Sequence, residues 1–152
     1  MPNTIKVLFL CTGNSCRSQM AEGFTRSLRG DVLDAGSAGY EARGLDPHAI
    51  AVMREVGIDI SRQRSKTLED LGNTKYQYVV TVCSEADERC PVYRGEAKMI
   101  HHGFDDPSTL CRHARTEEER LDYYRRVRDE IRAYVLTLSE SLTADHREIL
   151  GR

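Results

Sequence analysis

The sequence has no long apolar run and no strong charge of one sign. Its 152 residues carry a formal net charge of -2, and the 30% of residues that are charged are interspersed in sign. We therefore expect neither the basic footprint of a nucleic-acid-binding protein nor an acidic tail. The first apolar run, Val7 to Leu10, is too short for a membrane span or a signal-peptide core. These absences favour a cytoplasmic protein with no membrane and no nucleic-acid partner.

Internal repeats, low-complexity segments and linkers are missing as well. With 39% hydrophobic residues, the chain is long enough to bury one core of its own. We expect a single domain over residues 1–138, followed by a polar C-terminal extension at 139–152. We also expect a monomer.

The five cysteines form an odd set: Cys11, Cys16, Cys83, Cys90 and Cys111. Because a cytoplasm keeps thiols reduced, a structural disulfide framework is not expected. Cys16 and Cys111 are interpreted as small buried hydrophobic residues. The cysteines and histidines lack the C-x-x-C pairs and spacings of zinc fingers and ribbons, so we expect no metal and no cofactor.

Strand patterns alternate with helix patterns along the chain. Strands are predicted at 5–10, 32–37, 76–82 and 97–101, and helices from about 16 to 30, 46 to 57 and 116 to 138. This order predicts an α/β fold with three layers, in which a four-stranded parallel sheet carries helices on both faces.

A polar loop joins the first predicted strand to the first helix. In parallel sheets, ligands bind beyond the carboxyl ends of the strands, where this loop lies. Its backbone N–H groups and the positive end of the helix dipole predict a cradle for a tetrahedral oxyanion. Arg17 adds a planar fork that can grip two oxygens. The predicted oxyanion-binding residues are Thr12, Gly13, Asn14, Ser15, Cys16, Arg17 and Ser18.

Cys11 lies at the floor of this cradle. The helix dipole and Arg17, which attract an anion, also stabilise a thiolate, and Ser18 can donate a hydrogen bond to the sulfur. Cys11 is therefore the predicted nucleophile, aimed at the central atom of the bound oxyanion.

The spacing C-x-x-x-x-x-R-S directly after a strand resembles the phosphate-binding signature of the low-molecular-weight protein tyrosine phosphatases. The longer string "CTGNSCRSQMAEG" is more similar to the thioredoxin-coupled arsenate reductases that share the phosphatase fold. The resemblance covers about residues 4–138. It implies that Asp106, in an Asp-Pro pair, is the general acid that protonates the departing oxygen, which leaves Asp105 a structural role.

Reduction of arsenate needs a second thiol, because two thiols becoming a disulfide supply two electrons. Cys83 ends the third predicted strand as Cys11 ends the first, and neighbouring strands about 4.8 Å apart are within disulfide reach. The resemblance implies a relay through Cys11, Cys83 and Cys90 that thioredoxin reduces. If residues 83–90 were helical, the Cα atoms of Cys83 and Cys90 would lie about 10.5 Å apart, and the segment would have to unwind.

We therefore predict an arsenate reductase, with phosphate or sulfate as substrate analogues and with weak phosphatase activity. A phosphatase whose extra cysteines protect Cys11 is the first alternative, although Ser108 and Thr109 replace the tyrosine pair common after the phosphatase acid. A non-catalytic oxyanion or redox sensor is the second.

Some reductases of this family hold a potassium ion with side chains that correspond here to Asn14, Glu22 and Ser37. A further acidic ligand falls near Lys66, where this chain has a cation instead. We expect Lys66 to pair with Glu22 in the place of the ion, so that activity does not depend on potassium.

Overall fold

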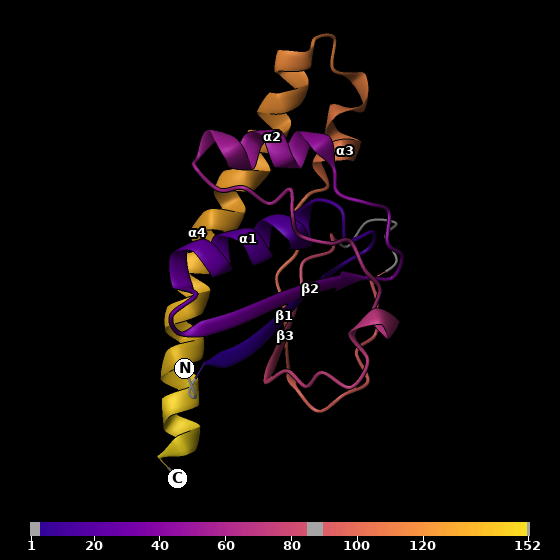
Figure 1. Cartoon of the computed structure of the whole chain (residues 1–152). Helices are drawn as coiled ribbons and strands as arrows, with labels where there is room; N and C mark the ends of the chain where they lie inside the picture. Colours follow the sequence, from indigo (N-terminus) through magenta and orange to yellow (C-terminus); the bar gives the residue numbers. More distant parts are fainter. Residues whose placement is uncertain (1–3, 85–89, 152) are drawn as a thin grey trace.

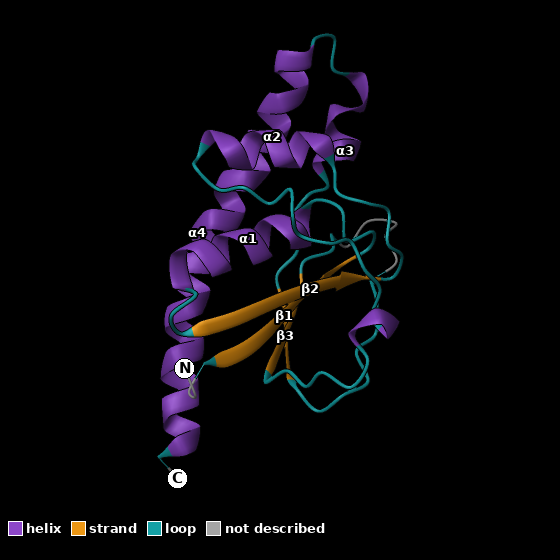
Figure 2. Cartoon of the chain, viewed as in Figure 1, coloured by secondary structure: helices purple, strands orange, loops and turns teal. Residues whose placement is uncertain are grey.

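The computed structural model describes residues 4–84 and 90–151. Figures 1 and 2 show a sheet with helices packed along it. The strands are β1 (Ile5–Cys11), β2 (Leu33–Gly39), β3 (Tyr78–Thr81) and β4 (Lys98–His101). The helices are α1 (Arg17–Arg29), α2 (Pro47–Glu55), α3 (Pro107–Leu110) and α4 (Glu117–Leu150), with short 3-10 turns η1 (Glu69–Leu71) and η2 (Cys111–His113).

The four strands form one parallel sheet in the order β2-β1-β3-β4. This confirms the predicted fold class. Leu10 of β1 pairs with Ala38 of β2 and with Thr81 of β3, so that the carboxyl ends of all three strands meet at one edge. The residues after β1 and after β3 are therefore neighbours, as expected if Cys83 is to lie within disulfide reach of Cys11.

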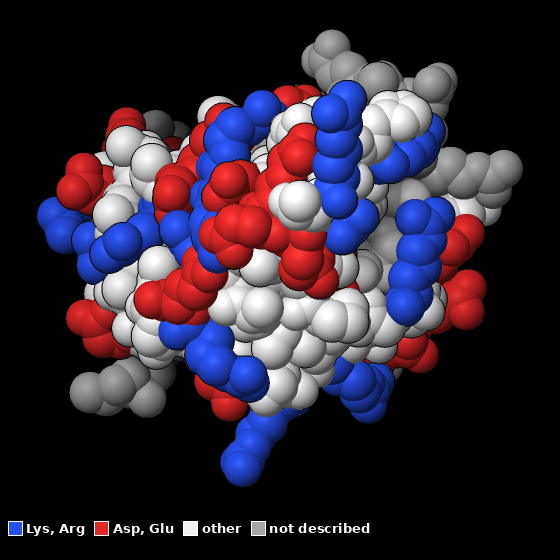
Figure 3. Space-filling view, turned by 90° about the horizontal axis from the view of Figure 1, so that it is seen from above, with Lys and Arg blue, Asp and Glu red and all other residues white. Residues whose placement is uncertain are grey.

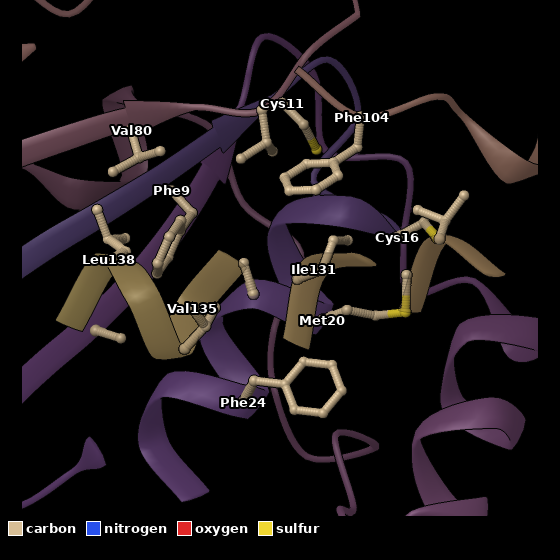
Figure 4. Close-up of a cluster of buried hydrophobic side chains, with 14 of the residues drawn as sticks. Phe9, Cys11, Cys16, Met20, Phe24, Val80, Phe104, Ile131, Val135 and Leu138 are labelled. Carbon is tan, nitrogen blue, oxygen red and sulfur yellow. The ribbon is translucent and has the colours of Figure 1, made fainter. Parts of the chain in front are cut away.

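Both faces of the sheet are covered, which explains the nearly continuous apolar run of β1. Val7 and Phe9 point to one face and belong to a core shared with α1 and α4, through residues such as Phe24 and Ile131 (Figure 4). Leu8 and Leu10 point to the other face. There the cover is lighter, because side chains from η1 and the loops at 68–76 and 93–97 pack on the strands in place of a long helix.

The C-terminal helix departs from the expectation of a polar extension after Ser139. Helix α4 continues to Leu150 without a break. Leu142 is buried, and the Asp145 carboxylate accepts a hydrogen bond from the Tyr78 hydroxyl at 2.6 Å and pairs with Lys98 at 3.0 Å. The predicted helix end was wrong because these docking contacts to β3 and β4 are distant in sequence and leave no local pattern.

The surface mixes charges of both signs, as the composition indicates. On the face drawn in Figure 3, Lys and Arg side chains are interspersed with Asp and Glu side chains. None of the helices in the described ranges combines the length and apolar character needed to cross a bilayer.

Candidate active site

The oxyanion loop, residues 11–18, starts at the last residue of β1 and ends in the first turn of α1. The Cys11 thiol is buried, and its Sγ lies 2.8 Å from the Ser18 Oγ. The Asn14 amide donates to the same Ser18 oxygen at 2.8 Å. Because that oxygen accepts from Asn14, the Ser18 hydroxyl proton is free to point at the Cys11 sulfur, where it stabilises a thiolate.

Asn14 holds the loop in shape. Its backbone φ is 46°, a left-handed conformation that asparagine tolerates better than most residues. Its amide also donates to Ser37 at 2.9 Å, and its carbonyl oxygen accepts from the backbone of Lys66 and from Gln19. A fully hydrogen-bonded, buried side chain at this point keeps the loop amides pre-organised for an anion.

Arg17 joins the loop to the segment after β4. Its guanidinium is buried, donates to the Phe104 carbonyl at 3.0 Å and lies 3.6 Å from the Asp106 carboxylate. Phe104 in turn donates its N–H to the carbonyl of Val82 at the end of β3, and its ring lies beside Cys11 (Figure 4). The structure thus brings the predicted nucleophile, anion-binding arginine and acid together.

Asp106 is also the N-cap of α3. One carboxylate oxygen accepts from the N–H of Ser108 at 3.0 Å and from its hydroxyl at 2.8 Å. The side chain remains 24% exposed, so it can reach both the loop and water. Asp105 points elsewhere and pairs with Arg126 of α4 at 2.8 Å, in agreement with a structural role.

Cys83 lies directly beside the oxyanion loop. It is buried, and its Sγ lies 3.9 Å from the Thr12 hydroxyl and 4.0 Å from the Leu10 carbonyl, the two residues on either side of Cys11. The prediction that β1 and β3 place these two thiols near each other agrees with the sheet order.

Cys90 is hydrogen-bonded to Cys83, and this contact, followed by burial, raises the pKa of the Cys83 thiol well above its usual range. Cys83 and Cys90 themselves lie outside any helix. Their side chains are in contact, so these two residues do not have the separation that a helix over 83–90 would impose. Residues 85–89, which lie between them, are outside the described part of the chain.

Cys16 and Cys111 are both buried. Burial is the main cause that raises the pKa of the Cys16 thiol well above its usual range, and the nearby Asp46 and Asp106 carboxylates raise it further. A buried, protonated thiol is a poor nucleophile. This supports the interpretation that Cys16 contributes its backbone to the loop and takes no part in thiol exchange.

Lys66 lies beside Glu22, as expected if its ammonium takes the place of a bound potassium ion. Its ammonium is 3.8 Å from the Glu22 carboxylate, which accepts a hydrogen bond from Ser37 at 2.6 Å. Burial lowers the pKa of Lys66, and the Glu22 charge opposes that shift. The predicted pairing of Lys66 with Glu22 is confirmed.

Several residues that support the loop were not found from the sequence. Gln63 donates to Gln19, which donates to both carbonyl oxygens of Asn14. Arg43 binds the Gly13 carbonyl through its backbone N–H. Gln63 and Arg43 lie in loops far along the chain from residues 11–18, whereas Gln19 follows the loop directly in α1. Nothing in their local composition indicates these contacts. In the described ranges, 4–84 and 90–151, no group of three or more His, Cys, Asp or Glu side chains could hold a metal ion.

This arrangement supports two kinds of chemistry in succession. A thiol below an oxyanion cradle, with an acid at the rim, can displace an oxygen from a tetrahedral oxyanion. A second thiol beside the first, in contact with a third, can then exchange disulfides.

We compared the chain with known protein families, curated proteins and solved structures. Residues 6–148 match the family model described as low molecular weight phosphotyrosine protein phosphatase. The chain is 49% identical over 131 residues to an arsenate reductase of Bacillus subtilis, which covers 86% of this chain and 91% of the relative. It is 46% identical over 135 residues to an arsenate reductase of Halalkalibacterium halodurans, covering 89% and 95%. A solved arsenate reductase in its phosphate-binding state matches with a TM-score of 0.70 at 33% identity, over 89% of this chain and 96% of that one.

Proposed function

Because the chain belongs to the low molecular weight phosphotyrosine protein phosphatase family, we propose that its oxyanion loop serves arsenate reduction, with Cys11, Cys83 and Cys90 as a disulfide relay. The observation that carries this proposal is the position of Cys83. Its thiol lies against Thr12 and Leu10, beside the nucleophile, and contacts Cys90. A phosphatase needs neither thiol. The curated relatives named above are arsenate reductases, which supports the same reaction here.

In the first step, the Cys11 thiolate attacks the arsenic atom of bound arsenate. The loop amides and the Arg17 side chain hold the remaining oxygens. Asp106 gives its proton to the departing oxygen, which leaves as water. The product is a covalent adduct between the Cys11 sulfur and arsenic(V).

In the second step, the Cys83 thiolate attacks the Cys11 sulfur. A Cys11–Cys83 disulfide forms and the sulfur–arsenic bond breaks. The electron pair of that bond leaves with arsenic, which departs as arsenite, so two thiols are oxidised as arsenic(V) becomes arsenic(III).

In the third step, Cys90 attacks the Cys83 sulfur and frees Cys11. The resulting Cys83–Cys90 disulfide is the form that an external dithiol reduces. We propose thioredoxin as that dithiol and the cytoplasm as the compartment, since both supply the reducing conditions that the free cysteines need.

Weak hydrolysis of small aryl phosphates belongs to the same proposal. Phosphate and arsenate are both tetrahedral oxyanions, and the cradle, nucleophile and acid serve either one. A phosphatase with protective cysteines and a non-catalytic sensor remain the two competing functions.

One assay separates the three functions. The purified protein is given arsenate, thioredoxin, thioredoxin reductase and NADPH, and is compared with Cys83→Ser and Cys90→Ser variants. We expect arsenate turnover to disappear in both variants while p-nitrophenyl phosphate hydrolysis persists. Hydrolysis without arsenate turnover in the wild type supports the phosphatase, and neither activity supports the sensor. Cys111→Ser is the matched control, because it removes a buried thiol that has no role in the relay.

A further inference from the structure

Residues 41–46, which follow β2 and are here called the strap, run alongside the oxyanion loop. Three backbone hydrogen bonds of 2.9 to 3.0 Å attach it there. The bonds run from Glu41 to Thr12, from Arg43 to Gly13 and from Asp46 to Ser15, each from an N–H to a carbonyl. The strap therefore holds a fixed position beside the cradle, and any side chain on it that points along the loop stays at the rim.

Arg43 is such a side chain. A Cβ built on Gly13 would lie 2.6 Å from the Arg43 Cδ and 3.0 Å from its Cγ. The aliphatic stem of Arg43 thus lies flat against Gly13 and forms the outer wall of the loop at this point. Gly13 leaves room for that stem, which explains a glycine here independently of backbone conformation.

The charged end of Arg43 is available to a ligand. The side chain is 54% exposed, and its Nε donates to the Glu41 carboxylate, itself 50% exposed, at 2.8 Å. Exposed ion pairs of this kind contribute little stability and exchange readily. An anion at the rim can therefore take the place of Glu41 at low cost.

Carboxylates near the loop oppose the positive charge of Arg17. Arg17 shares its charge with Asp106, 3.6 Å away. The Asp46 and Asp106 carboxylates both act electrostatically on the loop, as their effect on the pKa of Cys16 indicates. An arsenate anion that approaches the cradle therefore meets an Arg17 charge that is partly cancelled, and these carboxylates oppose its entry.

We propose that Arg43 is a second substrate-binding guanidinium of this site, which exchanges Glu41 for the incoming oxyanion and guides it onto the loop. The role of arsenate in this proposal rests on the proposed function, whereas the anion-binding role does not. Arg43 acts on binding and not on the chemical steps, since Cys11 and Asp106 carry those.

The test uses inorganic phosphate as the probe and isothermal titration calorimetry as the readout. Arg43→Met keeps the apolar stem that covers Gly13 and removes the charge. We expect it to weaken phosphate binding about tenfold at low ionic strength, with a smaller loss at high salt. Arg43→Lys, which restores a charge, should recover most of the affinity. Glu41→Gln should tighten binding because it removes the competing carboxylate.

Arg54→Met is the matched control. Arg54 is also an exposed arginine with one carboxylate partner, Asp59 at 4.0 Å, but it lies at the far end of α2. We expect it to bind phosphate as the wild type does. Equal affinity of wild type and Arg43→Met overturns the inference, as does an equal loss in Arg54→Met or no recovery in Arg43→Lys. In arsenate turnover, Arg43→Met should raise KM and leave kcat unchanged.

The same titration separates this inference from the proposed function. A wild-type protein that binds phosphate but reduces no arsenate contradicts the proposed function. The role of Arg43 in anion binding is then still decided by the phosphate affinities of the Arg43 variants. Arsenate turnover together with full phosphate affinity in Arg43→Met contradicts the inference alone.

Discussion

The two ends of the proposed relay differ in how their thiols are held. The Cys11 sulfur lies 2.8 Å from the Ser18 hydroxyl, whose oxygen accepts a hydrogen bond from the Asn14 amide. Cys83 is buried and hydrogen-bonded to Cys90, and both conditions favour its protonated form. In the proposed relay, the exchange step therefore requires Cys83 to lose a proton.

The largest effect should come from removing the Cys11 thiol. Cys11→Ser leaves the cradle and Asp106 in place but lacks the nucleophile, so we expect arsenate turnover and aryl phosphate hydrolysis both to fall about 10⁴-fold or more. Steady-state assays of the two reactions measure this. Retention of either activity would show that a different residue attacks.

The next largest effect concerns the acid that both reactions share. Asp106→Asn cannot donate the proton to the departing oxygen, and we expect both activities to fall about 10²-fold to 10⁴-fold. Asparagine remains a good N-cap for α3, so the thermal midpoint should stay close to that of the wild type. A loss of activity that follows a loss of stability would instead assign Asp106 a structural role.

A smaller effect sharpens the contrast between the two thiols. The raised pKa of Cys83 means that its thiolate is scarce at neutral pH and increases as the pH rises. In a single turnover without reductant, arsenite release should therefore accelerate as the pH rises from about 7 to 9. Cys90→Ala removes the hydrogen-bond partner and should lower the pKa of Cys83, so that release at neutral pH becomes faster although multiple turnover is lost.

Rapid-quench measurement of arsenite across this pH range tests that expectation. Cys111→Ala, which removes another buried thiol, should keep the wild-type profile. A wild-type rate that does not change with pH, or that falls as the pH rises, would show that proton loss from Cys83 does not limit the exchange.

The smallest effect is an expected absence of change. Because Lys66 lies 3.8 Å from Glu22, replacement of sodium by potassium at constant ionic strength should leave arsenate turnover unchanged. Lys66→Asp removes the ammonium and adds a carboxylate, and should introduce potassium activation. Potassium activation of the wild type would contradict the interpretation that Lys66 occupies the place of an ion.

Regions built from adjacent residues could be predicted from the sequence, whereas regions built from distant segments could not. β1 and the oxyanion loop are local: an apolar strand, a glycine, an arginine and a helix start follow one another, so their geometry can be inferred from adjacent residues. The position of Cys83 next to the oxyanion loop was predictable because the sheet order makes β3 a neighbour of β1.

Other features depend on contacts between distant segments. The stem of Arg43 on Gly13, the support of Asn14 by Gln19 and Gln63, and the docking of Asp145 on Tyr78 all join residues whose local sequence is ordinary polar loop or helix. The pairing of Cys83 with Cys90 was implied by the resemblance, but their contact in the reduced protein could not be derived from the seven-residue spacing, which is compatible with several backbone conformations.

The most direct test of the relay is a map of its disulfides after one turnover. The reduced protein is mixed with arsenate without thioredoxin, remaining thiols are blocked by alkylation, and disulfide-linked peptides are identified by mass spectrometry. We expect a Cys83–Cys90 disulfide, with Cys11 recovered as an alkylated thiol. Arsenite release without any Cys83–Cys90 bond would contradict it.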